Sequence, residues 1–136
     1  MTLTDAGPLI ALVDAQDPAN GRCRDVLDLL RLPLLTTYSA FTEAMHLLGR
    51  AGGWYAQEGL WRLVHSERLA LATPSPSADR RAAELMEQYA DQPMDIADAT
   101  LVALAEERDE TRIFTLDGDF QNYRLKGRRH LEIIPE

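Results

Sequence analysis

Residues Pro93–Glu107 read PMDIADATLVALAEE, an apolar helical pattern with an acid set inside it. Leu101 and Val102 follow Asp98 by three and four residues, and Ala105 follows it by seven. These offsets share one face of an α-helix. A carboxylate beside an apolar stripe lowers stability unless something pairs with it. The stretch therefore predicts a buried helix whose aspartate serves a purpose other than packing.

Short strand patterns alternate with helical patterns on both sides of this helix. Strands are predicted at residues 2–4, 34–37, 68–72, 111–117 and 131–135, and further helices at 8–15, 21–32, 39–48, 54–66 and 78–89. Ser39 and Ser77 are the expected caps of the helices that they precede. The alternation favours a parallel sheet with helices on both faces. We therefore expect an α/β fold, three-layer α/β/α with a mostly parallel central sheet, as a single domain over residues 1–136.

The composition limits the class of protein. Hydrophobic residues make up 46% and charged residues 26% of the chain, which is ordinary for a globular domain. No apolar run approaches the roughly 18 residues of a membrane span. The start MTLTDAG lacks the basic residues of a secretory signal. Cys23 is the only cysteine, so an intramolecular disulfide is impossible. We therefore expect a cytoplasmic protein.

The net charge of −8 argues against a polyanionic partner, because nucleic acids attract clustered Lys and Arg. The distribution is less one-sided than the total. The stretch RLKGRRH contains four fixed positive charges, at Arg124, Lys126, Arg128 and Arg129. A basic segment near the end of the chain thus offsets the acidic balance locally.

Acidic residues occur at or shortly after the C-terminal ends of the predicted strands. Asp5 ends the first strand, Asp117 and Asp119 follow the fourth, and Glu43 lies early in the helix after the second. Asp98 lies near the start of a helix that must deliver the chain to the foot of the fourth strand. In a parallel sheet these positions meet at the carboxyl edge, where ligands bind. We therefore expect these carboxylates to converge.

Carboxylates gathered this closely repel one another and raise one another's pKa unless a cation joins them. Mg²⁺ and Mn²⁺ prefer oxygen ligands. Two such ions, roughly 3.5–4 Å apart, would clamp both the attacking and the leaving oxygen of a phosphoryl group. They would also halve the formal net charge of −8. One or two divalent ions are thus the expected cofactor.

Each acid also has a local explanation. Asp95 could cap its helix and Asp98 could be a first-turn acid favoured by the helix dipole, and both roles are compatible with metal binding. Asp5 could cap the helix around Pro8. Asp117 could form a turn at Gly118.

Two further acids share this ambiguity. Asp119 is an equally good turn former in the sequence LDGD. Glu43 could be a first-turn acid behind Ser39, close to a capping-box arrangement. Any one of these positions is weak by itself, and the weight of the prediction lies in their convergence.

Four blocks of the sequence resemble PIN-domain ribonucleases, and specifically the VapC-type toxins of bacterial toxin–antitoxin pairs. They are LTDAGPLIALVD with Asp5, LLTTYSAFTEAMHLLGR with Glu43, YADQPMDIADATLVALAEE with Asp98, and IFTLDGDF with Thr115 and Asp117. The blocks occur in the family's order and span nearly the whole chain. Asp95 and Asp119 stand beside the motif aspartates, so the assignment within each pair is open.

The resemblance implies a Mg²⁺- or Mn²⁺-dependent endoribonuclease in which an activated water attacks the RNA phosphodiester. Asp5, Glu43 and Asp98 would hold the metal. Asp117, and with it Asp119, would complete the site or bind a second ion. Thr115 would support the site by hydrogen bonding.

The family also implies partners. A VapC-type toxin of a type II pair is a homodimer, and a small antitoxin crosses its active-site groove with its C-terminal segment. The helices around Trp54 and Trp61 are the expected place for antitoxin contact. Contact with RNA would fall to Arg124, Lys126, Arg128 and Arg129.

Two other classes of protein compete. Receiver domains and aspartate-based phosphatases also gather acids and Mg²⁺ at a sheet edge, but they would need a second acid beside Asp5 and a nearby lysine. Asp5 is followed by Ala6, Gly7 and Pro8, and Lys126 is the only lysine. A binding module that has lost its activity is the third interpretation, and the presence of all four acids gives it no support.

Overall fold

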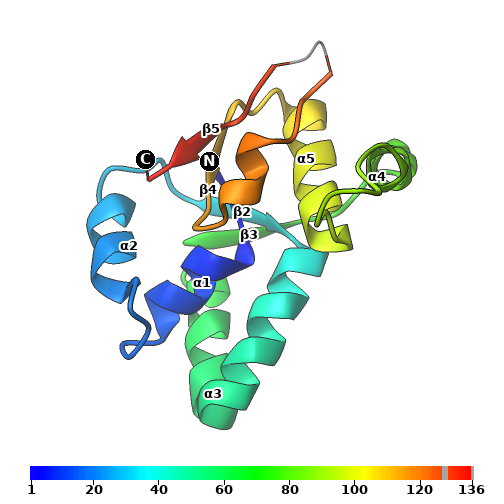
Figure 1. Ribbon diagram of the computed structural model, residues 1–136. Coiled ribbons are helices and arrows are strands. Elements are labelled where there is room, and N and C mark those ends of the chain that lie inside the picture. Colours follow the sequence, from blue (N-terminus) through cyan, green and yellow to red (C-terminus); the bar gives the residue numbers. More distant parts are fainter. Residues whose placement is uncertain (127–128, 136) are drawn as a thin grey trace.

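A parallel sheet of five strands forms the centre of the molecule (Figure 1). The structure, a computed structural model, describes residues 1–126 and 129–135. The strands lie in the order β3-β2-β1-β4-β5, and each neighbouring pair is parallel. Their bounds are β1 Thr2–Thr4, β2 Leu34–Thr37, β3 Leu69–Ala72, β4 Arg112–Phe114 and β5 Glu132–Ile134. The first strand is thus central, flanked by segments from distant parts of the sequence.

Helices cover both faces of this sheet. One side carries α1 (Ala6–Val13), α2 (Asn20–Leu27) and α3 (Tyr38–His65), and the other carries α4 (Pro76–Gln88), α5 (Ile96–Arg108) and the 3-10 helix η1 (Gly118–Gln121) (Figure 1). Successive strand residues serve opposite faces: Leu34 packs with the first group of helices and Leu35 with the second. The three-layer α/β/α prediction is confirmed.

Three helices begin at other residues than predicted. Thr37, rather than Ser39, caps α3, because its hydroxyl accepts the N–H of Ala40 and its backbone is already extended. Ser75, rather than Ser77, caps α4 by accepting the N–H of Ala78. α1 begins at Ala6, directly after Asp5, because Asp5 caps it. In each case the helix begins directly after the residue whose side chain accepts one of its free backbone N–H groups.

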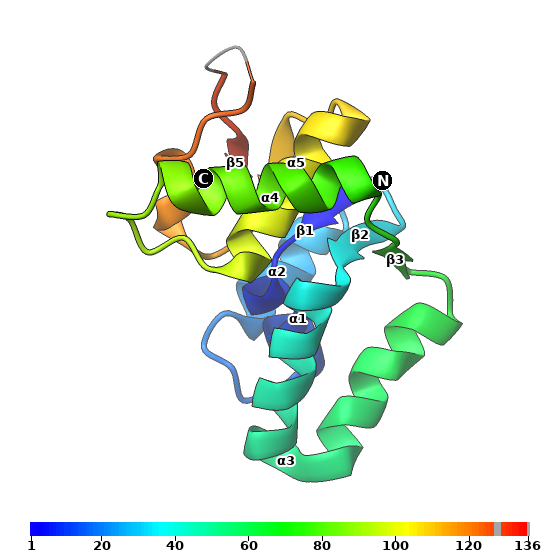
Figure 2. The same cartoon turned by 90° about the vertical axis from the view of Figure 1, so that its right-hand side faces the viewer.

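Two helix ends also differ. The helix predicted to reach residue 32 ends at Leu27, and the chain continues in tight turns in which Leu29 and Leu30 donate to carbonyls three residues back. The helices predicted at 39–48 and 54–66 are two arms of α3, which is non-helical only at Gly52 and Gly53. The arms fold back on each other as a hairpin (Figure 2). In the described part of the chain, no helix has the length and hydropathy of a transmembrane span.

Candidate metal centre

Three carboxylates meet at the carboxyl edge of the sheet. Asp5, Asp98 and Asp117 each offer an oxygen, and these oxygens all lie within 4.8 Å of one another. Asp5 and Asp98 are buried, and Asp117 is half-buried. Asp5 follows β1, Asp117 lies three residues beyond the end of β4, and Asp98 lies in the first turn of α5. The three side chains therefore come from distant segments, and the outermost two, Asp5 and Asp117, are more than a hundred residues apart in the sequence.

Asp5 is held from both of its oxygens. Oδ1 accepts the N–H of Ala6 at 2.8 Å, and Oδ2 accepts the hydroxyl of Thr115 at 2.9 Å. The Thr115 hydroxyl oxygen in turn accepts the N–H of Asp117 at 3.0 Å. Asp5 thus caps α1, as its local explanation proposed, and it also stands in the acid cluster. Thr115 ties two of the three acids into one unit.

Asp98 is held by one neighbour in the sequence and by one from a distant segment. Asp95 caps α5 by accepting the N–H of Asp98 at 2.9 Å. The phenol of Tyr123 donates to Asp98 Oδ2 at 2.9 Å. Sequence reasoning missed Tyr123, because an aromatic residue three positions after Phe120 indicates only core packing. No sequence pattern indicates that the hydroxyl of Tyr123 donates a hydrogen bond to Asp98, 25 residues earlier in the chain.

Glu43 faces the same cleft from α3 without joining the three close carboxylates. The cleft has a volume of about 430 Å³, and Asp5, Glu43, Asp95, Asp98 and Asp117 line it together with an apolar wall of Ile10, Leu47 and Leu116. Because α3 begins at Tyr38 and has no acid in its first turn, Glu43 is not the first-turn acid of the local explanation. Its exposed side chain lies at the rim.

The electrostatics of the cluster call for a cation. The pKa of Asp98 is raised to about 7, chiefly by burial and in addition by the charges of Asp95, Asp5 and Asp117, while the hydrogen bond from Tyr123 lowers it. Burial likewise raises the pKa of Asp5, and the Ala6 and Thr115 hydrogen bonds oppose that rise.

The neighbouring acids also affect the pKa of Glu43. Burial, followed by the charges of Asp95, Asp5 and Asp117, raises the pKa of its carboxyl. Acids that raise one another's pKa across a cleft, with only oxygen donors at the centre, match the ligand preference of Mg²⁺ or Mn²⁺. The donor set therefore fits a hard divalent ion.

Asp119 lies in η1, beside Asp117 but outside the group of three. Its backbone N–H donates to Asp117 Oδ1 at 2.9 Å, so Asp117 caps η1. The turn-forming explanation holds for Asp117, which also belongs to the cluster.

The basic segment lies at the other end of α5. The backbone N–H of Lys126 donates to Glu106, and Arg129 pairs with Asp109 at 3.8 Å. Glu106 is eight residues beyond Asp98, a rise of about 12 Å along a helix.

Two further residues were predicted in this segment. The Arg124 guanidinium donates to the carbonyls of Gln121 and Tyr123. Arg128 lies outside the described residues. The described members of the set, Arg124, Lys126 and Arg129, do not line the cleft of the acid cluster.

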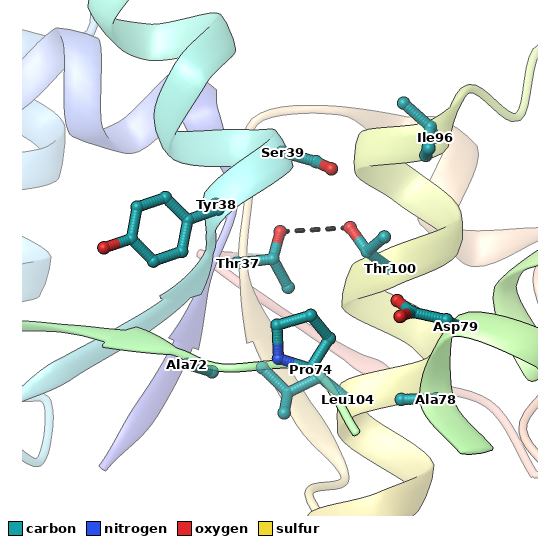
Figure 3. Close-up of a pocket in the computed structure, with 10 residues that line it drawn as sticks. All are labelled: Thr37, Tyr38, Ser39, Ala72, Pro74, Ala78, Asp79, Ile96, Thr100 and Leu104. Atoms are coloured by element: carbon teal, nitrogen blue, oxygen red, sulfur yellow. Dashed lines mark hydrogen bonds between the residues drawn. The ribbon is translucent and has the colours of Figure 1, made fainter. Parts of the chain in front are cut away.

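A second, more apolar cavity lies on the opposite face of α5 (Figure 3). It has a volume of about 120 Å³ and is lined by Thr37, Tyr38, Ser39, Ala72, Pro74, Ala78, Asp79, Ile96, Thr100 and Leu104. Thr37 and Thr100 share a hydrogen bond of 3.0 Å across it. Because Thr37 caps α3 and Thr100 belongs to α5, this bond braces the helix of Glu43 against the helix of Asp98.

Comparison with known proteins agrees with this geometry. The family model of the PIN domain matches residues 2–126. The chain belongs to the PIN domain family, and the resemblance of its four sequence blocks is thereby confirmed. No curated protein sequence matches the chain.

Two solved structures have the same fold. The crystal structure of Mycobacterium tuberculosis VapC20, a sarcin-ricin loop cleaving toxin, matches with a TM-score of 0.82 at 19% identity, over 90% of this chain and 94% of that one. A toxin–antitoxin complex from Klebsiella pneumoniae matches with a TM-score of 0.66 at 20% identity, over 88% and 90%. The fold is that of VapC-type toxins.

Proposed function

We propose that the protein is a Mg²⁺- or Mn²⁺-dependent endoribonuclease formed by a single domain over residues 1–136. The observation that carries the proposal is the group of carboxylates of Asp5, Asp98 and Asp117, whose oxygens lie within 4.8 Å of one another in a protein of the PIN domain family. These three side chains hold the ion, and Glu43 completes the set from the rim of the cleft. A bound divalent ion polarises a phosphoryl oxygen and lowers the pKa of a bound water.

Neighbouring residues hold the carboxylates of the site in place. Thr115 and the N–H of Ala6 fix the Asp5 carboxylate, and capping of η1 fixes Asp117. Glu43, exposed and with a raised pKa, is placed to hydrogen-bond a water or an RNA oxygen that enters the cleft. Ile10, Leu47 and Leu116, which also line the cleft, give a ribose or base an apolar surface beside the acids. Asp119 supports the site through its N–H to Asp117.

The same proposal includes a biological role. The protein acts in the cytoplasm as the toxin of a type II toxin–antitoxin pair, as a homodimer silenced by a small antitoxin. The likeness in fold to a toxin–antitoxin complex supports this role. Trp54 and Tyr55, 63% and 82% exposed near the bend of the α3 hairpin, offer the antitoxin an apolar surface. Trp61 is less available, because its ring packs against Phe41 at 5.1 Å.

Contact with RNA outside the cleft is assigned to Arg124, Lys126, Arg128 and Arg129. Lys126 and Arg129 contact Glu106 and Asp109 at the C-terminal end of α5, two or more helical turns from Asp98. Arg124 lies closer, because it follows Tyr123, whose hydroxyl contacts Asp98. An RNA strand that enters the cleft and continues along α5 would reach them.

Cleavage of RNA tests the proposal directly. The purified protein is incubated with a sarcin–ricin loop hairpin and with an unrelated hairpin, in Mg²⁺ or Mn²⁺. We expect cleavage that EDTA and Asp98→Asn abolish. Asp79→Asn is the matched control, because Asp79 is the first-turn acid of α4, as Asp98 is of α5, but lines the other cavity. If neither hairpin is cut, a cleavage map of RNA from expressing cells decides whether any RNA is a substrate.

The receiver hypothesis predicts a different result, namely no RNA cleavage and stable phosphorylation by acetyl phosphate. The position of Lys126 disfavours it, because its backbone is bonded to Glu106 near the far end of α5. An inactive binding module would give neither cleavage nor phosphorylation.

A further inference from the structure

Tyr123 makes a buried contact with the candidate metal centre. Its phenol donates to Asp98 Oδ2 at 2.9 Å, and the residue is only 1% exposed. A hydroxyl at this depth cannot be exchanged for a solvent molecule without opening the fold. The hydrogen bond is therefore a fixed part of the interior.

The ring of Tyr123 is held independently of Asp98. It makes edge contacts with Phe120 and with Tyr89, each with ring centroids 5.3 Å apart. The hydroxyl of Tyr89 accepts the N–H of Arg124 at 2.9 Å, so the neighbouring ring is itself anchored to the backbone next to Tyr123. The position of the phenol is thus fixed by packing contacts that do not involve Asp98.

We propose that Tyr123 is a positioning residue of the metal centre, which holds the Asp98 carboxylate in the rotation that it needs to share a cation with Asp5 and Asp117. The terminal torsion of an aspartate is broad, so a donor on one oxygen sets where the carboxylate points. Thr115 does the same for Asp5. Loss of such outer partners typically weakens metal binding by about 10- to 100-fold. The inference rests on the proposed function, because it requires that the acid cluster binds a metal.

Mn²⁺ binding without RNA tests the inference. Tyr123→Phe keeps the ring and its packing and removes only the hydroxyl. Tyr89→Phe is the matched control, since it removes a hydroxyl from the same aromatic cluster that contacts Arg124 instead of Asp98. By titration calorimetry, we expect Tyr123→Phe to bind Mn²⁺ about 10-fold more weakly than the wild type. Tyr89→Phe should bind it as the wild type does, whatever either change does to the melting temperature.

The rate of RNA cleavage at different Mn²⁺ concentrations is a second test of the role of Tyr123. At low Mn²⁺, Tyr123→Phe should cleave RNA more slowly than the wild type, and saturating Mn²⁺ should restore most of the rate. A purely structural role would lower activity at every metal concentration.

The outcomes separate the two proposals. Equal Mn²⁺ affinity of Tyr123→Phe and the wild type, or equal weakening in Tyr89→Phe, would overturn the positioning role and leave the metal site standing. If Asp98→Asn binds Mn²⁺ as tightly as the wild type, the metal site itself is wrong, and the role of Tyr123 is rejected with it.

Discussion

Thr115 donates its hydroxyl to Asp5 Oδ2 at 2.9 Å, although the two residues are 110 positions apart in the sequence. The register of the central strands explains the contact. Thr4 of β1 is paired with Phe114 of β4, so the residue that follows each strand emerges at the same height of the carboxyl edge. A backbone hydrogen bond fixes the same register, because the N–H of Asp5 donates to the carbonyl of Phe114 at 2.9 Å. The pairing of β1 with β4 therefore sets the relative position of Asp5 and Thr115, and with it that of Asp117.

Removing this hydroxyl should weaken both the fold and the site. Thr115→Val leaves Asp5 Oδ2 and the N–H of Asp117 without their partner, which costs about 1–3 kcal/mol of unfolding free energy in urea. Mn²⁺ affinity should fall as well. Thr36→Val is the control, because that buried hydroxyl donates to the Thr4 carbonyl and to no acid. A similar loss of Mn²⁺ affinity in Thr36→Val would contradict the specific role of Thr115.

The pH dependence of stability should report Asp98. Its pKa is about 7 in the folded protein and 3.8 in the unfolded reference. Between these values the folded state keeps a proton that the unfolded state has released, so raising the pH favours unfolding. In EDTA, we expect the free energy of unfolding to fall by up to about 3 kcal/mol between pH 5 and pH 8, since the folded pKa lies about two units above pH 5 and each unit corresponds to about 1.4 kcal/mol.

Asp98→Asn should leave only the part of this dependence that Asp5 and Glu43 contribute, and it should make the metal-free protein more stable near pH 8. Asp79→Asn should instead cost about 0.3–1 kcal/mol through the helix dipole of α4. A large loss of stability in metal-free Asp98→Asn would show that the carboxylate serves the helix start alone.

Metal binding should release protons at mildly acidic pH. Because Asp98 keeps a proton near pH 6, an ion must displace it, and the affinity for Mn²⁺ should rise between pH 6 and pH 8. Calorimetry in two buffers of different ionisation enthalpy counts the released protons. At a concentration 100-fold above Kd, Mn²⁺ should stabilise the fold by about 2.7 kcal/mol. The same rise in melting temperature in Asp98→Asn would place the ion elsewhere.

The bend of α3 depends on Gly53. Its φ of 61° and ψ of −153° lie in a region that L side chains avoid, so Gly53→Ala should cost about 1–3 kcal/mol. Gly21→Ala is the control, since Gly21 lies within α2 with open space where a Cβ would go. That change should be neutral or stabilise by up to about 1 kcal/mol. Thermal melts of the two variants check the pair, and a Gly53→Ala protein as stable as wild type would rule out this turn geometry.

The sheet and the convergence of acids could be predicted because both follow from local patterns. Alternating strands and helices limit the connections to a parallel sheet, and parallel strands bring Asp5 and Asp117 to one edge. Glu43 was predicted to join them, and it lines the cleft from the rim, because Ala40, Phe41 and Ala44 form the buried face of α3 and Glu43 lies outside that face.

What escaped prediction depends on contacts between remote segments. Tyr123 reaches Asp98 only because the chain after η1 packs over α5. The basic segment was expected to contact RNA, which stays a prediction. Its described residues Lys126 and Arg129 lie on the return of the chain to the start of β5, in contact with Glu106 and Asp109. Its charges are visible in the sequence, but their partners are not.

The placement of β4 between β1 and β5 has a consequence for biosynthesis. During translation Asp5 emerges before Asp98, and Asp117 and Tyr123 emerge after both. A nascent chain therefore lacks a complete set of clustered carboxylates until the segment after β4 has been made. If the proposed ribonuclease activity is correct, the ribosome that makes the protein is not exposed to it before that point.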